Sequence, residues 1–185
     1  LLAEANARLR ELATTDGLTG LYNYRHFEAT LRIEIQRTER LGIPLALLAI
    51  DVDHFKAFND AHGHPAGDRV LQDLAGQLRA RMRATDVVCR TGGEEFAIVL
   101  PGTTIEQASG LAEALRRRIQ EMPLKDERGR DVGSTTVSIG VAIFPDHAAD
   151  AAGLVKAADN ALYRAKQGGR NRVEFARVPT PPIEA

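Results

Sequence analysis

The sequence has little cysteine, no long apolar run and almost no net charge, and each of these absences excludes a class of protein. The sole cysteine, Cys89, cannot form an internal disulfide and is typical of a protein from a reducing compartment. The longest apolar run, Leu45–Ile50, is far too short to span a bilayer, and no signal peptide stands at the start. We therefore expect a cytoplasmic domain, which leaves open a membrane anchor elsewhere in a full-length protein.

The charge balance excludes binding that depends on bulk electrostatics. Lys and Arg number 24 and Asp and Glu number 25, so the net charge is −1. Nucleic acids and anionic membranes attract proteins with a strong positive excess, so we expect neither nucleic acid nor direct membrane contact. What is present is an ordinary globular composition, 44% apolar and 26% charged over 185 residues, which suits one domain with a short appendage.

The first residues carry an apolar spacing that indicates a helix. Leu2, Ala5, Leu9 and Leu12 follow the a/d seam of a coiled coil, but over only about two heptads. One interpretation is an amphipathic helix packed on its own domain. We favour the end of a longer connecting helix over residues 1–14. Because the chain does not begin with Met, we also expect it to belong to a longer protein.

The remaining sequence mixes helical and extended patterns, which predicts an α+β fold with helices on the faces of a sheet. Helices are expected where a helical apolar period ends at Gly or Pro, and strands where apolar or β-branched residues run together or alternate. The Pro-rich end, residues 177–185, is expected to be disordered. The predicted helices are about 24–41, 55–61, 65–83, 104–121 and 151–167, and the predicted β segments are 45–50, a hairpin over 86–100, 135–143 and 172–175.

Acidic side chains gather at the ends of two predicted β segments. Asp51 and Asp53 follow the buried strand directly, and Glu94 and Glu95 lie in the hairpin turn. A strand period of two puts the two aspartates on one face, where they repel each other unless a cation lies between them. If the two segments are neighbours in one sheet, this is the layout of a two-metal phosphoryl-transfer site. The alternative for Asp53 alone is an N-cap of the next helix.

Basic and polar residues elsewhere suit a nucleotide. Lys56 lies where the chain enters a predicted helix, whose free N–H groups accept phosphate. Lys166 lies in the last turn of another helix, and Arg170 follows the glycines that end it. Asn59 and Asp68 can read a purine edge. The alternatives are a solvated lysine, a cation that offsets a helix dipole, and ordinary caps and loop contacts.

Four motifs occur together in the order and spacing of one family. They are DGLTGLYN near the start, DVDHFKAFNDAHGHPAGD after the buried strand, GGEEF in the hairpin, and SIGVA followed by ADNALYRAKQGGRN near the end. From about Asp16 to Arg172 the sequence resembles the GGDEF family of diguanylate cyclases. The resemblance implies a palm-like fold related to nucleotidyl cyclases, with a mostly antiparallel sheet, in a catalytic domain over residues 15–176. It also implies the condensation of two GTP into cyclic di-GMP and two pyrophosphates.

The resemblance assigns roles to the acidic residues. Asp51 and Glu94 would bind Mg²⁺ or Mn²⁺ and serve catalysis, with help from the Val52 carbonyl group. Asp53 would stand close by as a further metal residue. Glu95 would be catalytic, either at a second metal or in removing the proton of the 3′-hydroxyl group.

The resemblance also implies a GTP site built from glycines, backbone N–H groups and basic side chains. Glycine lets the backbone approach the substrate where a Cβ atom would obstruct it. The residues so implied are Gly92 and Gly93 in the turn, His54, Phe55 and Lys56 at the phosphates, Asn59 and Asp68 at the guanine, and Lys166 and Arg170 at the terminal phosphates.

An R-x-x-D motif, Arg83 to Asp86, stands shortly before the hairpin. The family carries its product-inhibition site at this place, and arginine suits both phosphate and guanine. The alternative is a helix end with a cation near its C-terminus. A second arginine is expected to help, and the candidates in sequence are Arg116, Arg117 and Arg118.

The product adds a symmetry argument. Cyclic di-GMP joins two identical nucleotides by two equivalent linkages, which two protomers facing each other about a two-fold axis can supply. We therefore expect a homodimer, with a sensory domain upstream in the full-length chain. One alternative is a catalytically silent module that binds GTP or cyclic di-GMP, although its usual mark, a damaged signature, is missing here. Another is a cyclase of other nucleotides, against which Asp68 argues.

Overall fold

The computed structural model describes residues 13–126 and 128–178, and a five-stranded sheet lies at its centre. The strand order is β2-β3-β1-β4-β5, in which β1 (Leu45–Val52) pairs with β3 (Glu95–Pro101) and β4 (Val137–Phe144). Strand β2 (Val87–Arg90) continues the sheet beyond β3, and β5 (Val173–Phe175) lies at the other edge. The β4–β5 pair is parallel and the other three pairs are antiparallel. The predicted α+β fold with a mostly antiparallel sheet is confirmed.

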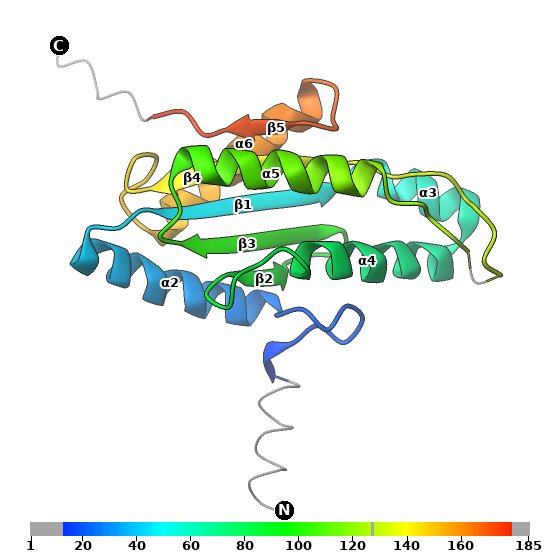
Figure 1. The fold of residues 1–185 in the computed structure, drawn as a ribbon, viewed down its shortest axis with the longest axis horizontal. Helices are drawn as coiled ribbons and strands as arrows, with labels where there is room; N and C mark the ends of the chain where they lie inside the picture. The colour runs from blue at the N-terminus through cyan, green and yellow to red at the C-terminus, as the bar shows by residue number, and fades with distance from the viewer. Residues whose placement is uncertain (1–12, 127, 179–185) are drawn as a thin grey trace, which may run out of the picture.

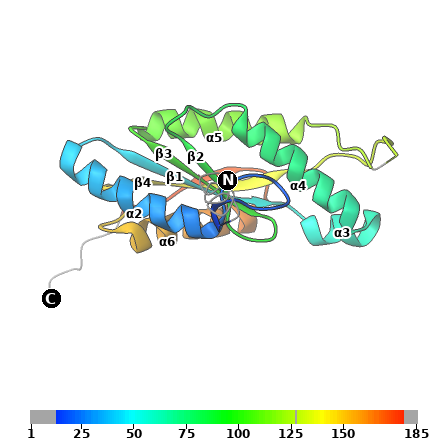
Figure 2. The same ribbon diagram turned by 90° about the horizontal axis from the view of Figure 1, so that it is seen from below.

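Helices cover both faces of this sheet, so the molecule has three layers (Figures 1 and 2). On one face lie α2 (Tyr24–Leu41) and α6 (Ala151–Gln167). On the other face lie α4 (His64–Arg79) and α5 (Ile105–Gln120). The short helix α3 (Phe55–His62) lies beyond the end of β1.

The alternation of side chains along β1 divides the core in two. The strand is buried along its whole length. Leu48 and Ile50 belong to the apolar cluster formed with α4 and α5, whereas Leu47 and Ala49 belong to the cluster formed with α2 and α6. Side chains of a strand alternate between faces, so Asp51 points to the α2–α6 face. The register of β1 thus decides on which face its acidic residue lies.

Helix α6 approaches the sheet very closely at Gly140 of β4. A Cβ atom at this position would come within 2.2 Å of the Ala158 carbonyl oxygen and 2.3 Å of the Leu162 amide nitrogen, both in the backbone of α6. Glycine inside a strand often marks such a close approach of another backbone. Lys166 follows Leu162 by about one helical turn, so this contact brings the end of α6 down onto the sheet.

Local signals predicted the helix ends well, with one exception. Helices α2 and α6 have the predicted bounds, because Gly42 and Gly168 cap them. The helix expected to reach Arg83 ends at Arg79. The Asp86 carboxylate accepts a hydrogen bond from the Arg83 amide at 2.8 Å, which holds the chain in a turn and ends the helix early. The predicted strand at 45–50 extends to residue 52, because its last two residues also pair with β4.

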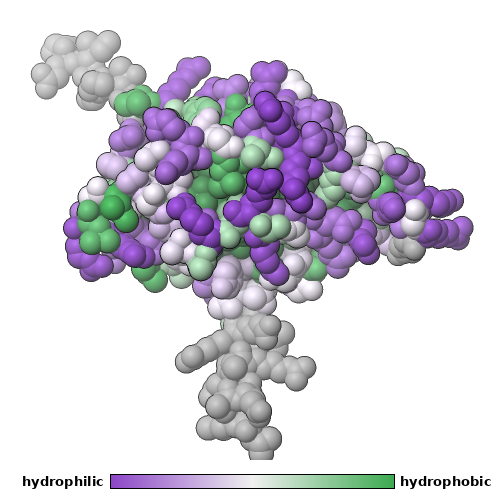
Figure 3. All heavy atoms as spheres, in the orientation of Figure 1, coloured by the Kyte–Doolittle hydropathy of each residue, from purple (hydrophilic) through white to green (hydrophobic). Residues whose placement is uncertain are grey.

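The surface is mostly polar. On the face shown in Figure 3, hydrophilic residues dominate and hydrophobic residues form small groups. In residues 13–126 and 128–178, no helix combines the length and apolarity that crossing a bilayer requires. The a/d pattern before residue 13 and the Pro-rich end after residue 178 lie outside the described residues, so the predicted connecting helix and disordered tail stay predictions.

Candidate active site

The two acidic segments meet at one end of the sheet. Asp51 of β1 pairs directly with Glu95 of β3, and the Val52 amide donates to the Glu94 carbonyl oxygen at 3.2 Å. Opposite residues on antiparallel strands have Cβ atoms about 4.5–5.5 Å apart. The condition for the predicted acidic site, that the two β segments are neighbours in one sheet, is therefore met.

A lysine from the far end of the chain contacts the central acid. The Nζ atom of Lys166 lies 2.7 Å from Asp51 Oδ2, and the Asp51 side chain is 8% exposed. Clustered carboxylates repel one another unless a cation compensates them. In this structure, the ammonium group of Lys166 supplies that charge. An interaction with the dipole of α6 alone would not place this group in contact with Asp51.

The acids at this end of the sheet favour their protonated forms more than usual. Burial raises the pKa of Asp51, Lys166 opposes this shift, and Glu95 adds to it. Burial and the charge of Asp51 raise the pKa of Glu94. Burial and Glu95 likewise raise the pKa of Asp159, on α6. Carboxylates with raised pKa values that converge in one place are typical of functional sites.

Asp53 is engaged by the protein itself. Its carboxylate accepts hydrogen bonds from Thr136 Oγ1 at 2.6 Å, Ser138 Oγ at 2.7 Å and the Asn171 amide at 2.9 Å. The N-cap interpretation is wrong, because the residue that precedes α3 is His54, with φ 57° and no side-chain capping bond. Asp53 instead ties the end of β1 to the start of β4 and to the loop after α6.

The two residues predicted to read guanine lie on neighbouring helices, Asn59 on α3 and Asp68 on α4. A Cβ atom at Gly67, next to Asp68, would come within 1.8 Å of Asn59 Oδ1. This oxygen is buried and has no hydrogen-bond partner among the described residues. Buried polar atoms are normally hydrogen-bonded, so Asn59 Oδ1 can accept a bond from a ligand.

The residues predicted for the phosphates begin α3 and follow α6. Phe55 is buried, Lys56 is exposed, and no side chain caps the first turn of α3. The first N–H groups of a helix lack intrahelical acceptors and attract anions. After α6, Arg170 has φ 63° and donates its amide to the Ala165 carbonyl oxygen at 3.0 Å, while its side chain is exposed.

The R-x-x-D motif forms the turn between α4 and β2. Arg83 Nε lies 3.3 Å from Asp86 Oδ2, and Arg83 Nη2 donates to Thr103 Oγ1 at 2.6 Å. The Asp86 side chain is 2% exposed, yet its Oδ1 atom has no partner among the described residues. Both residues line a cavity of about 410 Å³ that also touches Tyr22 and Arg79. An unpaired buried carboxylate oxygen beside a cavity is suited to a ligand with N–H donors.

The second arginine of this motif stays a prediction, since Arg116, Arg117 and Arg118 have other partners in this structure. Arg116 and Arg117 both pair with Glu113 at 2.8 Å, and Arg118 contacts a glutamine of α4. None of the three lines the cavity beside Asp86.

The acidic end of the sheet fits a metal that the substrate helps to hold. In the described part of the chain, no three His, Cys, Asp or Glu side chains come together as a metal site. Mg²⁺ usually takes one or two carboxylates and completes its shell with water and substrate phosphates. Asp51 and Glu94 offer only oxygen donors, and burial together with neighbouring acids raises the pKa of both, a shift that Lys166 opposes. The residues present therefore fit Mg²⁺ or Mn²⁺.

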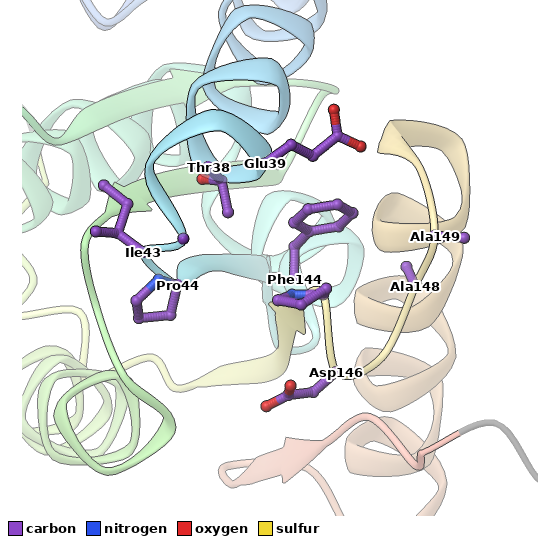
Figure 4. A pocket seen from close by; sticks show the side chains of 10 residues that line it. Thr38, Glu39, Ile43, Pro44, Phe144, Asp146, Ala148 and Ala149 are labelled. Carbon is purple, nitrogen blue, oxygen red and sulfur yellow. The ribbon is translucent and has the colours of Figure 1, made fainter.

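A large apolar cavity lies at the other end of β1 (Figure 4). It measures about 780 Å³ and is lined mainly by apolar groups of the α2–β1 and β4–α6 connections. Figure 4 shows the rings of Pro44 and Phe144 on its walls and the side chain of Asp146 pointing away from Phe144. Because Phe144 pairs with Leu45, at the opposite end of β1 from Asp51, this cavity is not part of the acidic site.

The sequence reasoning missed two residues and one ion pair near the acids, and they differ in the signal that could have found them. Gly140 interrupts a β-branched strand, and such a glycine indicates a close approach of backbone. Asp159 falls on a helix, and no local pattern indicates that it interacts with Glu95. The pairing of Arg90 with Asp16, at 3.1 Å, joins residues far apart in sequence, and no short motif announces it.

Fold and site together define an α+β domain with carboxylates gathered at one end of a mostly antiparallel sheet. The family model described as "Diguanylate cyclase, GGDEF domain" matches residues 13–172. The chain belongs to the GGDEF domain family of diguanylate cyclases, which confirms the family predicted from the motifs.

Relatives and solved structures agree with this assignment. The chain is 44% identical to diguanylate cyclase DgcP of Pseudomonas aeruginosa over 167 residues, 90% of this chain and 24% of DgcP. It is 40% identical to response regulator PleD of Caulobacter vibrioides over 163 residues, 88% of this chain and 36% of PleD. The chain therefore spans less than half the length of these two relatives. The crystal structure of the coiled coil and GGDEF domain of DgcB from Caulobacter crescentus, in complex with c-di-GMP, has a TM-score of 0.90 at 35% identity, with 95% of this chain and 92% of that chain covered.

Proposed function

We propose that this domain is a diguanylate cyclase, which condenses two GTP into cyclic di-GMP with release of two pyrophosphates. The observation that carries the proposal is the meeting of acids from two β segments around one cation. Asp51 lies opposite Glu95, and Lys166 Nζ lies 2.7 Å from Asp51. Membership of the family, and relatives that carry the name diguanylate cyclase, support it.

Each half of the reaction forms one bond and breaks one. The 3′-oxygen of one nucleotide bonds to the α-phosphorus of the other, and the bond between that phosphorus and the pyrophosphate oxygen breaks. The 3′-hydroxyl group loses its proton, and we assign its acceptance to Glu95. Lys56, Lys166 and Arg170 compensate the charge of the phosphates. Such reactions depend chiefly on positioning and on charge stabilisation.

A divalent ion belongs to this proposal, with Asp51, Glu94 and the Val52 carbonyl group as its protein ligands. Such an ion supplies charge neutralisation at the phosphates. Asp53 is left out of this ligand set, because its carboxylate already accepts three hydrogen bonds from the protein. Its proposed role is to hold the end of β1, and thereby Asp51, in place.

We assign the guanine base to Asn59 and Asp68. The unpaired Asn59 Oδ1 atom accepts a hydrogen bond, as does a carboxylate. The guanine edge offers donors at N1 and at the exocyclic amino group, whereas adenine does not offer this pair. The arrangement therefore favours GTP over ATP.

The product requires two copies of the site. One domain that holds one GTP cannot supply both nucleotides of a symmetric ring, so we assign catalysis to a homodimer in which two domains face each other. A closed two-fold arrangement presents the same surface on both copies. The segment before residue 13 is a suitable place for a partner or sensory domain to control this encounter.

The decisive experiment is incubation of the protein with GTP and Mg²⁺ followed by chromatography of the products. We expect cyclic di-GMP from the wild type and a rate at least about 100-fold lower from Glu94→Ala. Glu121→Ala serves as the control, because Glu121 is exposed at the end of α5. Product from Glu94→Ala at the wild-type rate would exclude the assigned site. GTP binding without any product from the wild type would instead indicate the silent binding module.

We further propose that Arg83 and Asp86 bind cyclic di-GMP and inhibit the enzyme. The buried, unpaired Asp86 Oδ1 atom suits the N–H donors of guanine, and the Arg83 side chain, 57% exposed, is accessible to a phosphate. Arg83→Ala should retain the initial rate and lose inhibition by added cyclic di-GMP. Arg81→Ala, an exposed arginine two positions away, should keep both. Inhibition that persists in Arg83→Ala would locate it elsewhere.

A further inference from the structure

Arg90, the last residue of β2, joins two parts of the chain that the proposed mechanism does not connect. Its Nη1 atom lies 3.1 and 3.2 Å from the two carboxylate oxygens of Asp16. Its Nε and Nη2 atoms donate to the Gly93 carbonyl oxygen at 3.2 and 2.7 Å. The side chains of Arg90 and Asp16 are 15% and 23% exposed. A guanidinium group held from both sides fixes the distance between its partners.

On one side of Arg90 lies the segment through which the chain enters the domain, residues 13–23, here called the entry loop. The Asp16 carboxylate organises this loop by accepting hydrogen bonds from the Thr19 amide at 2.9 Å and the Thr19 hydroxyl at 2.6 Å. The loop also pairs with the edge of β2, since the Arg90 amide donates to the Tyr22 carbonyl oxygen at 2.8 Å. The entry loop is thus attached to the strand that leads into the GGEEF turn.

On the other side of Arg90 lies the turn itself. The Gly93 carbonyl group and the Glu94 N–H group belong to one planar peptide unit. A Cβ atom at Gly93 would meet no heavy atom within 4 Å, so the turn is open on this side, and glycine permits more backbone conformations than other residues. Phe96, which is 1% exposed, anchors β3, and the amides of Thr91 and Gly92 close the turn by donating to the Glu95 carbonyl oxygen at 2.9 and 3.3 Å. The two hydrogen bonds from Arg90 restrain the peptide from which the Glu94 side chain projects.

We propose that Arg90 is a positioning residue of the catalytic turn, and that through Asp16 it makes the Gly93–Glu94 peptide sensitive to the entry loop. Contacts run without a break from Asp16 to Arg90 and on to Gly93. A displacement of the chain upstream of the loop therefore moves Asp16 first. The charge-assisted hydrogen bonds of Arg90 then shift the Gly93–Glu94 peptide, to which the Glu94 side chain is attached. This inference rests on the proposed function, because turnover is one of its readouts.

The first test compares steady-state kinetics of Arg90→Ala and Arg90→Lys. A misplacement of about 1 Å in a catalytic group can lower a rate about 100-fold, so we expect kcat of Arg90→Ala to fall about 10- to 100-fold with little change in KM for GTP. Arg90→Lys keeps a cation and recovers part of the loss. The control is Gln72→Ala. Gln72 Nε2 donates to the Leu18 carbonyl oxygen at 3.2 Å, so it holds the same entry loop without reaching the turn, and its removal should leave kcat unchanged.

The second test asks whether Asp16 acts through Arg90. Asp16→Asn, Arg90→Ala and the double variant form a cycle, and a shared path makes their effects on kcat non-additive. We expect the double variant to be no slower than Arg90→Ala. Additive effects would overturn the connection to the entry loop, and an unchanged kcat in folded Arg90→Lys and Arg90→Ala would overturn the positioning role.

A third readout does not depend on turnover, so it separates failure of this inference from failure of the proposed function. The exchange rate and chemical shift of the Glu94 amide can be followed by NMR in each folded variant. Arg90→Ala should alter both, whereas Gln72→Ala should alter neither. An unaltered Glu94 amide in Arg90→Ala would overturn the inference even if the wild type makes no cyclic di-GMP.

Discussion

The two ends of the central strand β1 differ in what their side chains contribute. At its start, Leu45 pairs with Phe144 beside an apolar cavity, and the neighbouring side chains belong to the core formed with α2 and α6. At its end, Asp51 pairs with Glu95 and contacts Lys166. Burial favours the fold at the first end and disfavours the charged form of the carboxylate at the second.

The difference shows how a functional site can be recognised without a bound ligand. Apolar burial at the Phe144 end has a sufficient explanation in stability. Partly buried acids with raised pKa values, an unpaired oxygen on Asn59 and an uncapped helix at α3 do not stabilise the fold. Proteins retain such features where a substrate or ion completes them.

One substitution at each end should separate stability from activity most sharply. Phe144→Ala should lower the free energy of unfolding by about 3 kcal/mol, because Phe144 is 3% exposed, and turnover per folded molecule should be unchanged. Asp51→Asn should reduce turnover at least about 100-fold with a change in unfolding free energy below about 1 kcal/mol. Its raised pKa means that the charged carboxylate adds no stability at neutral pH, and Lys166, 33% exposed, can be solvated.

Urea unfolding and product formation at saturating GTP measure both quantities. Strong destabilisation by Asp51→Asn, or loss of turnover in folded Phe144→Ala, would contradict the division between the two ends.

The close contact at Gly140, which pairs with Ala49 two residues before Asp51, predicts a second, smaller effect on stability. Gly140→Ala places a methyl group 2.2 Å from a backbone oxygen of α6, and such overpacking costs about 1–3 kcal/mol. Because α6 must move away from the sheet, Lys166 should lose its contact with Asp51 and turnover should fall as well. Gly110→Ala is a suitable control, since a Cβ atom there meets nothing within 4 Å. Equal stability of the two variants would contradict the observed packing.

The smallest expected effect concerns an acid remote from both ends. Hydrogen bonds from Arg116 and Arg117 outweigh burial and lower the pKa of Glu113 from 4.5 to about 2. A lowered pKa means that the stabilisation is complete above pH 4.5 and is lost as the pH falls toward about 2. The site acids shift the other way, so protonation of Asp51 and Glu94 favours the folded state, and that contribution is lost as the pH rises.

Glu113→Gln tests this sign. Because the Glu113 side chain is 37% exposed, the loss at pH 7 should be below about 1 kcal/mol, and it should shrink as the pH is lowered toward 3. Urea unfolding of both proteins across this range measures it. A constant difference at all pH values would show that the ion pairs are not its source.

Much of the fold could be predicted because its signals are local. The bounds of α2 follow from an apolar period that ends at Gly42, and those of α6 from one that ends at Gly168. The exception, the early end of α4, depends on the Asp86 carboxylate that accepts from the Arg83 amide. A side chain that competes with the helix for a backbone N–H group in this way leaves no periodic pattern in the sequence, so this helix end could not be predicted.

The candidate site was predicted in composition but not in its contacts. The acids and the GGEEF turn stand in recognisable motifs, and the α+β pattern made their meeting plausible. The partner of Asp51 and the three donors to Asp53 come from residues that only long-range pairing brings near. As a result, the N-cap interpretation of Asp53 was wrong, and the connection through Arg90 was missed.

By itself, the sequence determined the family, the order of helices and strands, and which residues carry charge at the turn. The features that show these are local: the helical period, the glycines that end helices, and the residues within each motif. Tertiary structure alone decided which charges face each other. The register of β1 against β3 sets Asp51 opposite Glu95, and the absence of a side chain at Gly140 lets α6 lie close enough for Lys166 to reach Asp51.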